Sequence, residues 1–458
     1  MQIEAGNGDR LSELPKDVLL NILERVDTLD AVRTCILSSQ LRNLPTMISQ
    51  IILVPSNRDL LRMNGVLAQL INKIFNTRSQ QITIRKLKLT FVLTPNDSRS
   101  IGKSVGLAMA THKVDAAEFE IVTPKNSYHC THADLLNFAK QFSSFVADCP
   151  DAFAGLTRLQ LQNLRFGDSD IPNILSTCKR LESLSFFECD AGIRSVLQVE
   201  HAGLVELSIT YGEFQTVELD CLPKLQRMTY NNWPSDENPL VLGFAPQLSK
   251  LSLANACLSD KTLMMSQLLA NVQTVSDLYL DFRSEKIWIQ PECPRVLAPV
   301  LGQLRSVNLD CLPEECDITW TMFLLEAARF IKDFCITVWD HKCGSESQKS
   351  YSKITDVKWE PSAPNFKHKN LSKLTIYGFQ SDGNFMGYIR RVMEAAVNIK
   401  EVCLYDRKVC KLCTDKFPHS EVRPSTYPRS CKEKDSLRKK ITEASVMMAS
   451  PAVIHFRS

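Results

Sequence analysis

Apolar residues recur through the middle of the chain in one short phrase, apolar-x-x-apolar-x-apolar. The phrase predicts a short strand, because its last apolar positions alternate with polar ones and face a common interior. It begins at Ile84, Leu156, Leu181, Leu204, Leu225, Leu248, Val275 and Leu304, with Ile331 as a further candidate. A chain built this way repeats one small structural unit.

The spacing of the phrases identifies the kind of repeat. From Leu156 onward, successive phrases begin 25, 23, 21, 23, 27, 29 and 27 residues apart. This matches the period of roughly 20–29 residues found in leucine-rich repeats, whose stacked units share one core. Asn163, Cys189 and Asn255 lie close to the position where such repeats favour Asn or Cys, whereas Asp310 departs from it. The alternative is a generic α/β domain with accidental periodicity.

Residues between the inward apolar positions are expected to form the open, concave face of a solenoid, a shape suited to gripping another protein. The candidate target-binding residues are Arg158, Gln160, Glu206, Ser208, Arg227, Tyr279 and Arg305, with Thr229 and Asn308 on the same face. They include both signs of charge and no stripe of one sign. The pattern therefore does not indicate nucleic acid or a phosphorylated ligand.

A separate helical pattern occupies the N-terminus. Pro15 suits the first turn of a helix, and Asp17 adds a favourable charge there. Val18, Leu19, Ile22, Leu23 and Val26 then recur at helical spacing. A second helix is expected from Ala31, and a third apolar pattern runs through Leu41 and Leu44 to Pro45. Three short helices cannot bury this surface among themselves, so they pack on the rest of the chain or on a partner.

The segment DRLSELPKDVLLNILERVDTLDAVRTCILS resembles the F-box of plant proteins. The resemblance includes Leu14-Pro15, Val18-Leu19, Ile22-Leu23 and the block from Asp30 to Thr34. It implies that the module docks on a Skp-type adaptor, which joins it to a cullin and a ubiquitin-conjugating enzyme. Family members usually continue with a basic pair and tryptophans, whereas this chain has Ser39-Gln40-Leu41. Loss of aromatic anchors would weaken docking by about 2 kcal/mol each.

The resemblance also nominates residues for the adaptor contact. They are the apolar residues of the module and its proline: Leu11, Leu14, Pro15, Val18, Leu19, Ile22, Leu23, Val32 and Leu37.

The C-terminal part begins with a Ser-, Lys- and Pro-rich stretch, 341–370, that predicts a loop. After it, Leu371-x-x-Leu374-x-Ile376 predicts a strand, Phe385 to Ala396 a helical face, and Val402-x-Leu404 a second strand. This unit resembles the FBD domain that follows F-box and repeat segments in plant proteins. The cues are His368 to Leu371, Gly378-Phe379 and the helix that ends before Ile399.

The predicted fold class is α/β: a small N-terminal helical F-box, an irregular leucine-rich-repeat solenoid and a C-terminal strand–helix–strand, FBD-like cap. The expected boundaries are 1–50 for the F-box, 51–345 for the repeats, 346–365 for a loop, 366–440 for the FBD-like domain and 441–458 for a tail.

Composition adds mainly exclusions. Hydrophobic residues make up 44% and charged residues 23%, as in average globular proteins. Lys and Arg exceed Asp and Glu by only 54 − 51 = 3, so net charge does not indicate nucleic acid. The sequence shows no secretory signal and no run of 18 apolar residues, so we expect no membrane association and a location in the cytoplasm, the nucleus or both. The 16 cysteines are expected to be reduced core residues.

Motifs for catalysis or metal binding are weak. Gly102-Lys103-Ser104 resembles the end of a phosphate-binding loop, but Asp97 replaces the glycine that such a loop needs. Cys410 and Cys413, with Cys403, His419 and Cys431 nearby, lack the second close pair typical of structural zinc, as does the segment His129 to His132. A basic run from Lys432 to Lys440 predicts a solvated face. We predict no catalytic residue, cofactor or metal.

The hypothesis from the sequence is a non-catalytic substrate receptor of an SCF-type ubiquitin ligase, with an unknown protein target. One alternative is a ligase-independent repeat scaffold whose degenerate F-box only caps the solenoid. Another is a small-molecule receptor in which ligand and target share the repeat surface.

Overall fold

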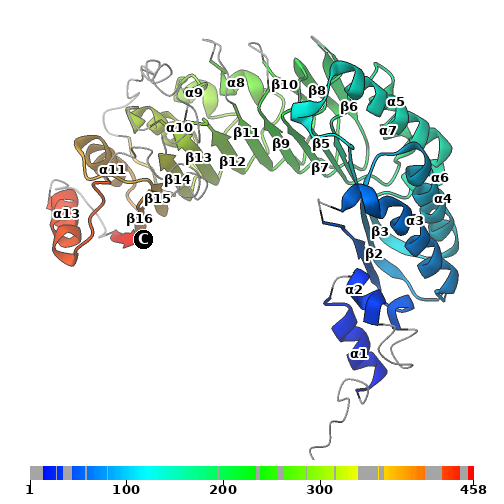
Figure 1. The fold of residues 1–458 in the computed structure, drawn as a ribbon. Helices are drawn as coiled ribbons and strands as arrows, with labels where there is room; N and C mark the ends of the chain where they lie inside the picture. The colour runs from blue at the N-terminus through cyan, green and yellow to red at the C-terminus, as the bar shows by residue number, and fades with distance from the viewer. Residues whose placement is uncertain are drawn as a thin grey trace, which may run out of the picture. The chain divides into compact units, whose positions relative to one another are not determined.

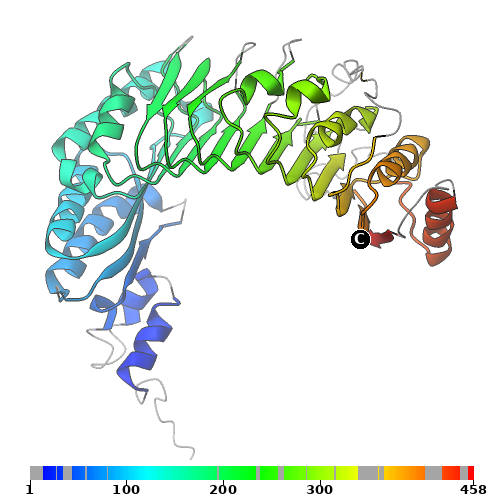
Figure 2. The same ribbon diagram turned by 180° about the vertical axis from the view of Figure 1, so that it is seen from behind.

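We analysed a computed structural model, which describes residues 14–26, 28–34, 44–56, 59–79, 81–192, 195–233, 238–255, 262–284, 286–313, 316–338, 359, 366–407, 425–443 and 452–457. The chain divides into two compact units. Unit 1 comprises residues 1–193 and 203–208, and unit 2 comprises 194–202 and 209–458. Figures 1 and 2 show the elements from opposite sides.

Unit 1 begins with short helices. They are α1 (Lys16–Leu23), α2 (Thr28–Arg33) and the 3-10 turn η2 (Leu44–Thr46). The helix α1 starts directly after Pro15, as its sequence predicts, but it ends at Leu23, so Val26 lies beyond it. The second helix begins earlier than Ala31. Residues 35–43, where the third apolar pattern begins, lie outside the described part.

A small core holds these helices together, and hydrogen bonds attach them to the first strand of unit 1. The core consists of Leu19, Leu23, Ala31, Leu44 and Ile48. The Glu24 carboxylate accepts hydrogen bonds from the Ser49 hydroxyl (2.6 Å) and backbone N–H (3.0 Å), which lower the pKa of Glu24. The buried Arg78 donates to the Thr46 and Ile48 carbonyls. The helical module and the first repeat therefore pack as one body.

The rest of unit 1 is a parallel sheet covered by helices. Neighbouring strands pair in the order β1 (Gln50–Leu53), β2 (Ile84–Val92), β3 (Val114–Val122), β4 (Arg158–Gln162) and β5 (Ser183–Phe187). The helices are α3 (Leu60–Thr77), α4 (Pro95–Thr111), α5 (His132–Asp148), α6 (Pro150–Ala154) and α7 (Asp170–Thr177), with the turn η3 (Ser127–His129). Phe91 and Phe119 of the sheet contact Phe145 and Phe153 of the helices, with ring centroids 6.1 and 5.9 Å apart. Phe145 and Phe153 contact each other at 4.9 Å.

Each predicted phrase forms a strand, and its three apolar residues are buried. The strand β7 (Glu206–Thr210) follows β5, and the division between the units crosses it. In unit 2 the parallel order is β9 (Arg227–Asn231), β11 (Lys250–Ala254), β12 (Asp277–Asp281), β13 (Ser306–Leu312), β14 (Asp333–Val338), β15 (Lys373–Tyr377), β16 (Glu401–Tyr405) and β17 (Val453–Arg457). These parallel strands and buried phrases confirm a leucine-rich-repeat type of α/β fold.

The connections between successive strands of the main sheet in unit 2 are of two kinds. Some repeats use short helices or turns: α8 (Met265–Leu268), α9 (Pro294–Leu297), η4 (Ile318–Thr321), α10 (Met322–Ala327), α11 (Gly383–Ala395) and, near the end, α13 (Cys431–Glu443). Others use strands, which form a separate three-stranded parallel sheet in the order β10 (Leu240–Phe244), β8 (Thr216–Cys221) and β6 (Val196–Glu200). Figure 2 shows both kinds of return.

The length of each repeat accounts for whether its returning segment is a helix or a strand. The phrases at Leu181, Leu204 and Leu225 precede the next phrase by 23, 21 and 23 residues, and these repeats contain the return strands. The phrases at Leu248, Val275 and Leu304 have periods of 27, 29 and 27, and these repeats contain helices. A strand advances roughly 3.3 Å per residue and a helix only 1.5 Å, so a short repeat can return only by extended chain.

The Asn and Cys positions after the strands also behave as such repeats require. Asn163 is fully buried, with a positive φ of 54°, and its amide donates to the Thr123 hydroxyl at 2.8 Å and to the Lys125 carbonyl. The buried Cys189 thiol contacts the Leu161 carbonyl. These side chains satisfy backbone groups where each strand turns away, which is why a small polar residue recurs there.

The C-terminal strand–helix–strand unit is present as β15, α11 and β16. Because β15 pairs with β14 in parallel, this unit continues the repeat sheet. An FBD-type cap is not confirmed by this geometry and stays a prediction. The loop predicted at 346–365 lies outside the described residues except for Trp359. The segment predicted as a tail contains β17, which pairs with β16 and which the sequence analysis did not predict.

The described cysteines differ widely in exposure. Cys149, Cys178, Cys189, Cys316 and Cys403 are buried, as expected, whereas Cys293 and Cys431 are exposed, so the cysteines are not all core residues. Burial raises the pKa of Cys178, Cys189 and Cys316 to about 12.

In the part of the chain that the structure describes, no helix is long and apolar enough to cross a bilayer.

The differences in cysteine exposure predict selective alkylation. At pH 8 a thiol with a pKa of about 12 holds roughly a thousandfold less thiolate than an ordinary cysteine, and only the thiolate reacts. We expect iodoacetamide to modify Cys293 and Cys431 in the native protein while Cys178, Cys189 and Cys316 react only after denaturation. Peptide mass spectrometry over a time course measures this, and equal native rates at Cys189 and Cys293 would contradict the fold.

Candidate protein-interaction surfaces

The first candidate surface lies on the helix α1. Its predicted apolar residues separate into two sides, because residues four apart share one side of a helix. Leu19 and Leu23, 1% and 5% exposed, belong to the small core. Val18 and Ile22, 39% and 38% exposed, point away from that core. We call the exposed residues Pro15, Val18 and Ile22 the α1 outer face.

The remaining predicted adaptor residues are distributed around this helix. Leu14 packs partly against the small core, and Val32 on α2 is half-buried. Leu11 and Leu37 lie outside the described residues. The structure therefore leaves the α1 outer face as the accessible part of the predicted set. It assigns Leu19 and Leu23 a different physical role, because a buried side chain reaches a partner only through the fold that it supports.

The second candidate surface is the open face of the sheet, formed by the side chains that alternate with the buried ones. In unit 1 it contains Arg158, Gln160, Glu206 and Ser208, which are exposed or half-buried as predicted. The Glu206 carboxylate accepts hydrogen bonds from the Arg158 guanidinium at 3.3 Å and the Ser183 hydroxyl at 3.2 Å. Lys86 and Lys88 likewise pair with Glu118 and Glu120 on the next strand. Cross-strand pairing thus neutralises much of the charge here.

In unit 2 the strand register arranges the open face in rows that run across the strands. Arg227 stands in register with Lys250 and Asp277, and Tyr279 stands between Ser252 and Asn308. Arg305, just before β13, is exposed, while Arg227 and Tyr279 are half-buried. On the strands of each unit the predicted target residues occupy one face, as alternation requires. Arg305 precedes β13 and stands one position before the alternating residues Ser306 and Asn308, so the strand pattern does not place it on that face.

Asp310 and its neighbours hold the Tyr279 side chain in place. The Tyr279 hydroxyl donates to the Asp310 carboxylate at 2.6 Å, and burial and this carboxylate raise the pKa of Tyr279. Asp281, Asp310 and Cys311 place possible metal-ligand atoms within 4.8 Å of one another. However, Asp281 accepts from the Arg283 backbone N–H at 2.8 Å and contacts its guanidinium. Internal donors and the nearby Arg283 charge therefore disfavour a cation at this cluster.

One part of the open face was not predicted from the sequence. Tyr377 and Tyr405 stand in register on β15 and β16, and their rings stack with centroids 4.4 Å apart. Arg457 continues the row on β17, with its guanidinium 3.4 Å from the Tyr405 hydroxyl. Tyrosine and arginine are the residues most enriched at interface hot spots. The phrase at Leu371 would have placed Tyr377 on this face had that segment been treated as a repeat.

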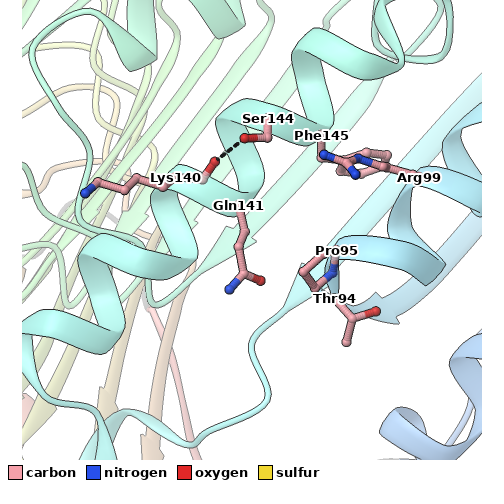
Figure 3. Close-up of a pocket in the computed structure, with 7 residues that line it drawn as sticks. All are labelled: Thr94, Pro95, Arg99, Lys140, Gln141, Ser144 and Phe145. Atoms are coloured by element: carbon pink, nitrogen blue, oxygen red, sulfur yellow. Dashed lines mark hydrogen bonds between the residues drawn. The ribbon is translucent and has the colours of Figure 1, made fainter.

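A small pocket between α4 and α5 offers little for a ligand (Figure 3). Its volume is about 160 Å³, below the roughly 300–1,000 Å³ typical of ligand sites. It is lined by Thr94, Pro95, Arg99, Lys140, Gln141, Ser144 and Phe145. The Arg99 guanidinium already pairs with Asp148, and the Ser144 hydroxyl donates to the Lys140 carbonyl at 2.9 Å. Most of the polar groups that would bind a ligand are therefore occupied.

The weak sequence motifs have structural explanations. Gly102 lies inside α4, where a Cβ atom would come within 2.5 Å of Phe145, so the glycine serves helix packing. Between His129 and His132, Thr131 caps α5 in a capping box with Asp134. The Cys410–Cys413 pair and His419 lie outside the described residues.

Comparison with known proteins identifies two kinds of domain in this chain. The F-box domain model matches residues 11–49, and the At1g61320/AtMIF1 LRR-domain model matches residues 143–444, about two thirds of the chain. The repeat match extends through β15, α11 and β16. A solved structure with some likeness is the crystal structure of a TLR13–ssRNA13 complex, with a TM-score of 0.36 and 14% identity over 73% of this chain and 49% of that chain.

Several curated relatives come from Arabidopsis thaliana. The F-box/LRR-repeat protein At3g26922 is 23% identical over 55% of this chain and 84% of its own length. The F-box/FBD/LRR-repeat protein At3g52680 is 29% identical over 44% and 45%, and the FBD-associated F-box protein At3g52670 is 27% identical over 39% and 44%. The match spans about half the length of several such relatives. The helical module, the parallel repeats and these matches together show that the chain belongs to the plant F-box/leucine-rich-repeat family whose repeats follow the At1g61320/AtMIF1 LRR-domain model.

Proposed function

We propose that this chain is the substrate receptor of an SCF-type ubiquitin ligase. The F-box would dock on a Skp-type adaptor, which connects it to a cullin, and the repeats would bind a target protein. The chain makes no bond itself; it raises the effective concentration of a target lysine near the charged conjugating enzyme. The proposal includes a cytoplasmic location, a nuclear one or both, supported by the free thiols of the described cysteines, several of which are buried.

The observation that carries the proposal is the division of α1 into a buried and an exposed apolar side. A short helix at the surface normally exposes polar residues, and Val18 and Ile22 gain nothing from exposure to water. A partner that covers Val18 and Ile22 would bury this exposed side of α1, in the manner of helix-in-groove recognition. The F-box match over residues 11–49 supports a Skp-type adaptor as that partner.

The open face supports the second half of the proposal. Its side chains are exposed or half-buried and mixed in charge, and cross-strand contacts such as Arg158–Glu206 and Tyr279–Asp310 hold several of them in place. A pre-organised surface of this kind loses little side-chain entropy when a protein binds. The small pocket between α4 and α5 gives no comparable support to a small-molecule receptor.

The test compares the wild-type chain with the variant Val18→Asp/Ile22→Asp in plant cells treated with a proteasome inhibitor. Each tagged chain is captured, and the ubiquitin remnants on co-captured proteins are quantified by mass spectrometry. We expect both chains to capture a shared set of proteins, and the wild type alone to raise the ubiquitin remnants on some of them. Equal remnants on every shared protein would favour the ligase-independent scaffold and refute the receptor function.

A further inference from the structure

The three-stranded sheet β6–β8–β10 of unit 2 has two sharply different sides. Side chains that point inward are buried: Leu197, Val199, Val217, Leu219, Leu240 and Leu242. The alternate side chains point outward and are exposed or half-buried: Val196, Gln198, Glu200, Thr216, Glu218, Asp220 and Val241. We call this outward side the back face, because it is turned away from the main sheet and its open face. No described helix or strand covers it.

Charge on the back face has one sign. Glu200, Glu218 and Asp220 contribute three carboxylates, and the strands β6, β8 and β10 contain no Lys or Arg. Among the described residues, no ion pair joins these carboxylates to a basic side chain; Glu218 accepts only a hydrogen bond from Gln198 at 3.0 Å. In contrast, the acids of the unit 1 open face are paired across strands, as Glu118 and Glu120 show.

Apolar side chains accompany these acids. Val196 and Val241 are exposed on the outer strands, and Phe244, at the end of β10, is 58% exposed. The register sets Val241 beside Glu218 and Phe244 beside Cys221. An exposed valine beside Glu218 and an exposed phenylalanine at the end of the same strand give this face the mixed apolar and charged composition of an interaction surface.

We propose that the back face is a third protein-docking surface, and that its occupant is a partner segment carrying Lys or Arg together with apolar side chains. Charge complementarity selects this occupant: basic side chains would neutralise Glu200, Glu218 and Asp220, while apolar ones cover Val241 and Phe244. The same sign repels nucleic acid and phosphorylated segments. The surface is distinct from the α1 outer face and from the open face, so adaptor, target and this third partner do not compete for residues.

The test uses the full chain and two labelled peptides of equal charge, octalysine and a sixteen-residue peptide of alternating Lys and Leu. Fluorescence anisotropy at low salt measures both affinities. We expect the triple variant Glu200→Gln/Glu218→Gln/Asp220→Asn to weaken octalysine binding about tenfold. The matched control, Asp115→Asn/Asp148→Asn/Asp435→Asn, removes three acids that pair with Lys113, Arg99 and Arg438 and that belong to neither candidate surface, so it should leave the affinity within about twofold.

A second pair of measurements tests the apolar part. The Lys–Leu peptide should bind more tightly than octalysine, and Val241→Ser/Phe244→Ser should remove that advantage while octalysine binding stays unchanged. Thermal unfolding confirms that each variant is folded. Equal weakening by the two triple variants, or a Lys–Leu advantage that survives Val241→Ser/Phe244→Ser, would overturn the proposal. A thermal shift with calcium ions alone that the back-face variant abolishes would also overturn it, by assigning the carboxylates to a cation.

Discussion

Replacing Gly378 with alanine should destabilise unit 2 by at least about 3 kcal/mol. Gly378 follows β15 with a φ of +77°, a conformation that costs an L-residue about 1–2 kcal/mol. A Cβ atom there would lie 2.0 Å from the Val338 carbonyl oxygen, so the backbone of β14 would have to shift. Urea unfolding followed by circular dichroism measures the loss.

The matched control for this prediction is Gly387→Ala. Gly387 lies inside α11, where an added Cβ meets nothing within 4 Å. Alanine favours a helix interior by up to about 1 kcal/mol over glycine, so this variant should be as stable as the wild type or more so. If Gly378→Ala unfolded at the same urea concentration as Gly387→Ala, the described turn between β15 and α11 would be incorrect.

The second large effect concerns adaptor binding. Val18→Asp/Ile22→Asp should weaken binding of a Skp-type adaptor at least about 100-fold, because it removes two apolar contacts and would bury two unpaired carboxylates. Thermal stability should change little, since both side chains are already exposed. Biolayer interferometry with immobilised adaptor measures the affinity, and differential scanning calorimetry measures the stability.

Two further variants separate docking from folding. Leu19→Asp places a charge in the small core, so it should lose adaptor binding and lower the unfolding temperature together. Leu61→Asp/Leu107→Asp changes two exposed apolar residues of unit 1 on α3 and α4, and it should alter neither property. Full adaptor binding by Val18→Asp/Ile22→Asp would place the docking surface elsewhere on the module.

The repeat architecture could be predicted from the sequence because each apolar phrase by itself predicts one strand. Strands that lack a regular phrase could not be predicted for the same reason. The strand β3 was not predicted, because Ala117 occupies a position of the phrase Val114-x-x-Ala117-x-Phe119 that usually has a large residue. Ala117 is nevertheless fully buried. The strand β17 was not predicted, because a single short strand has no periodicity to reveal it. It joins the sheet by pairing with β16. The length of each repeat also distinguishes the repeats that contain helices from those that contain return strands, and this distinction could have been predicted from the sequence.

The candidate site was predictable in kind but not in detail. Helical spacing groups Val18, Leu19, Ile22 and Leu23 on one broad apolar side, and only packing decides which of them meets the chain's own core. The open-face residues followed from strand alternation, whereas the pairing of Arg158 with Glu206 depends on strands 48 residues apart in sequence. The stacked Tyr377 and Tyr405 were missed because their segment was assigned to a separate domain.

We propose that this chain docks on a Skp-type adaptor through the α1 outer face. Isothermal titration of the purified full-length chain with the adaptor tests it most directly. We expect one adaptor bound per chain with a Kd at or below about 1 µM, and a loss of that heat signal in Val18→Asp/Ile22→Asp. A folded wild-type chain that gives no binding heat at adaptor concentrations of about 50 µM, roughly 50-fold above that value, would contradict it.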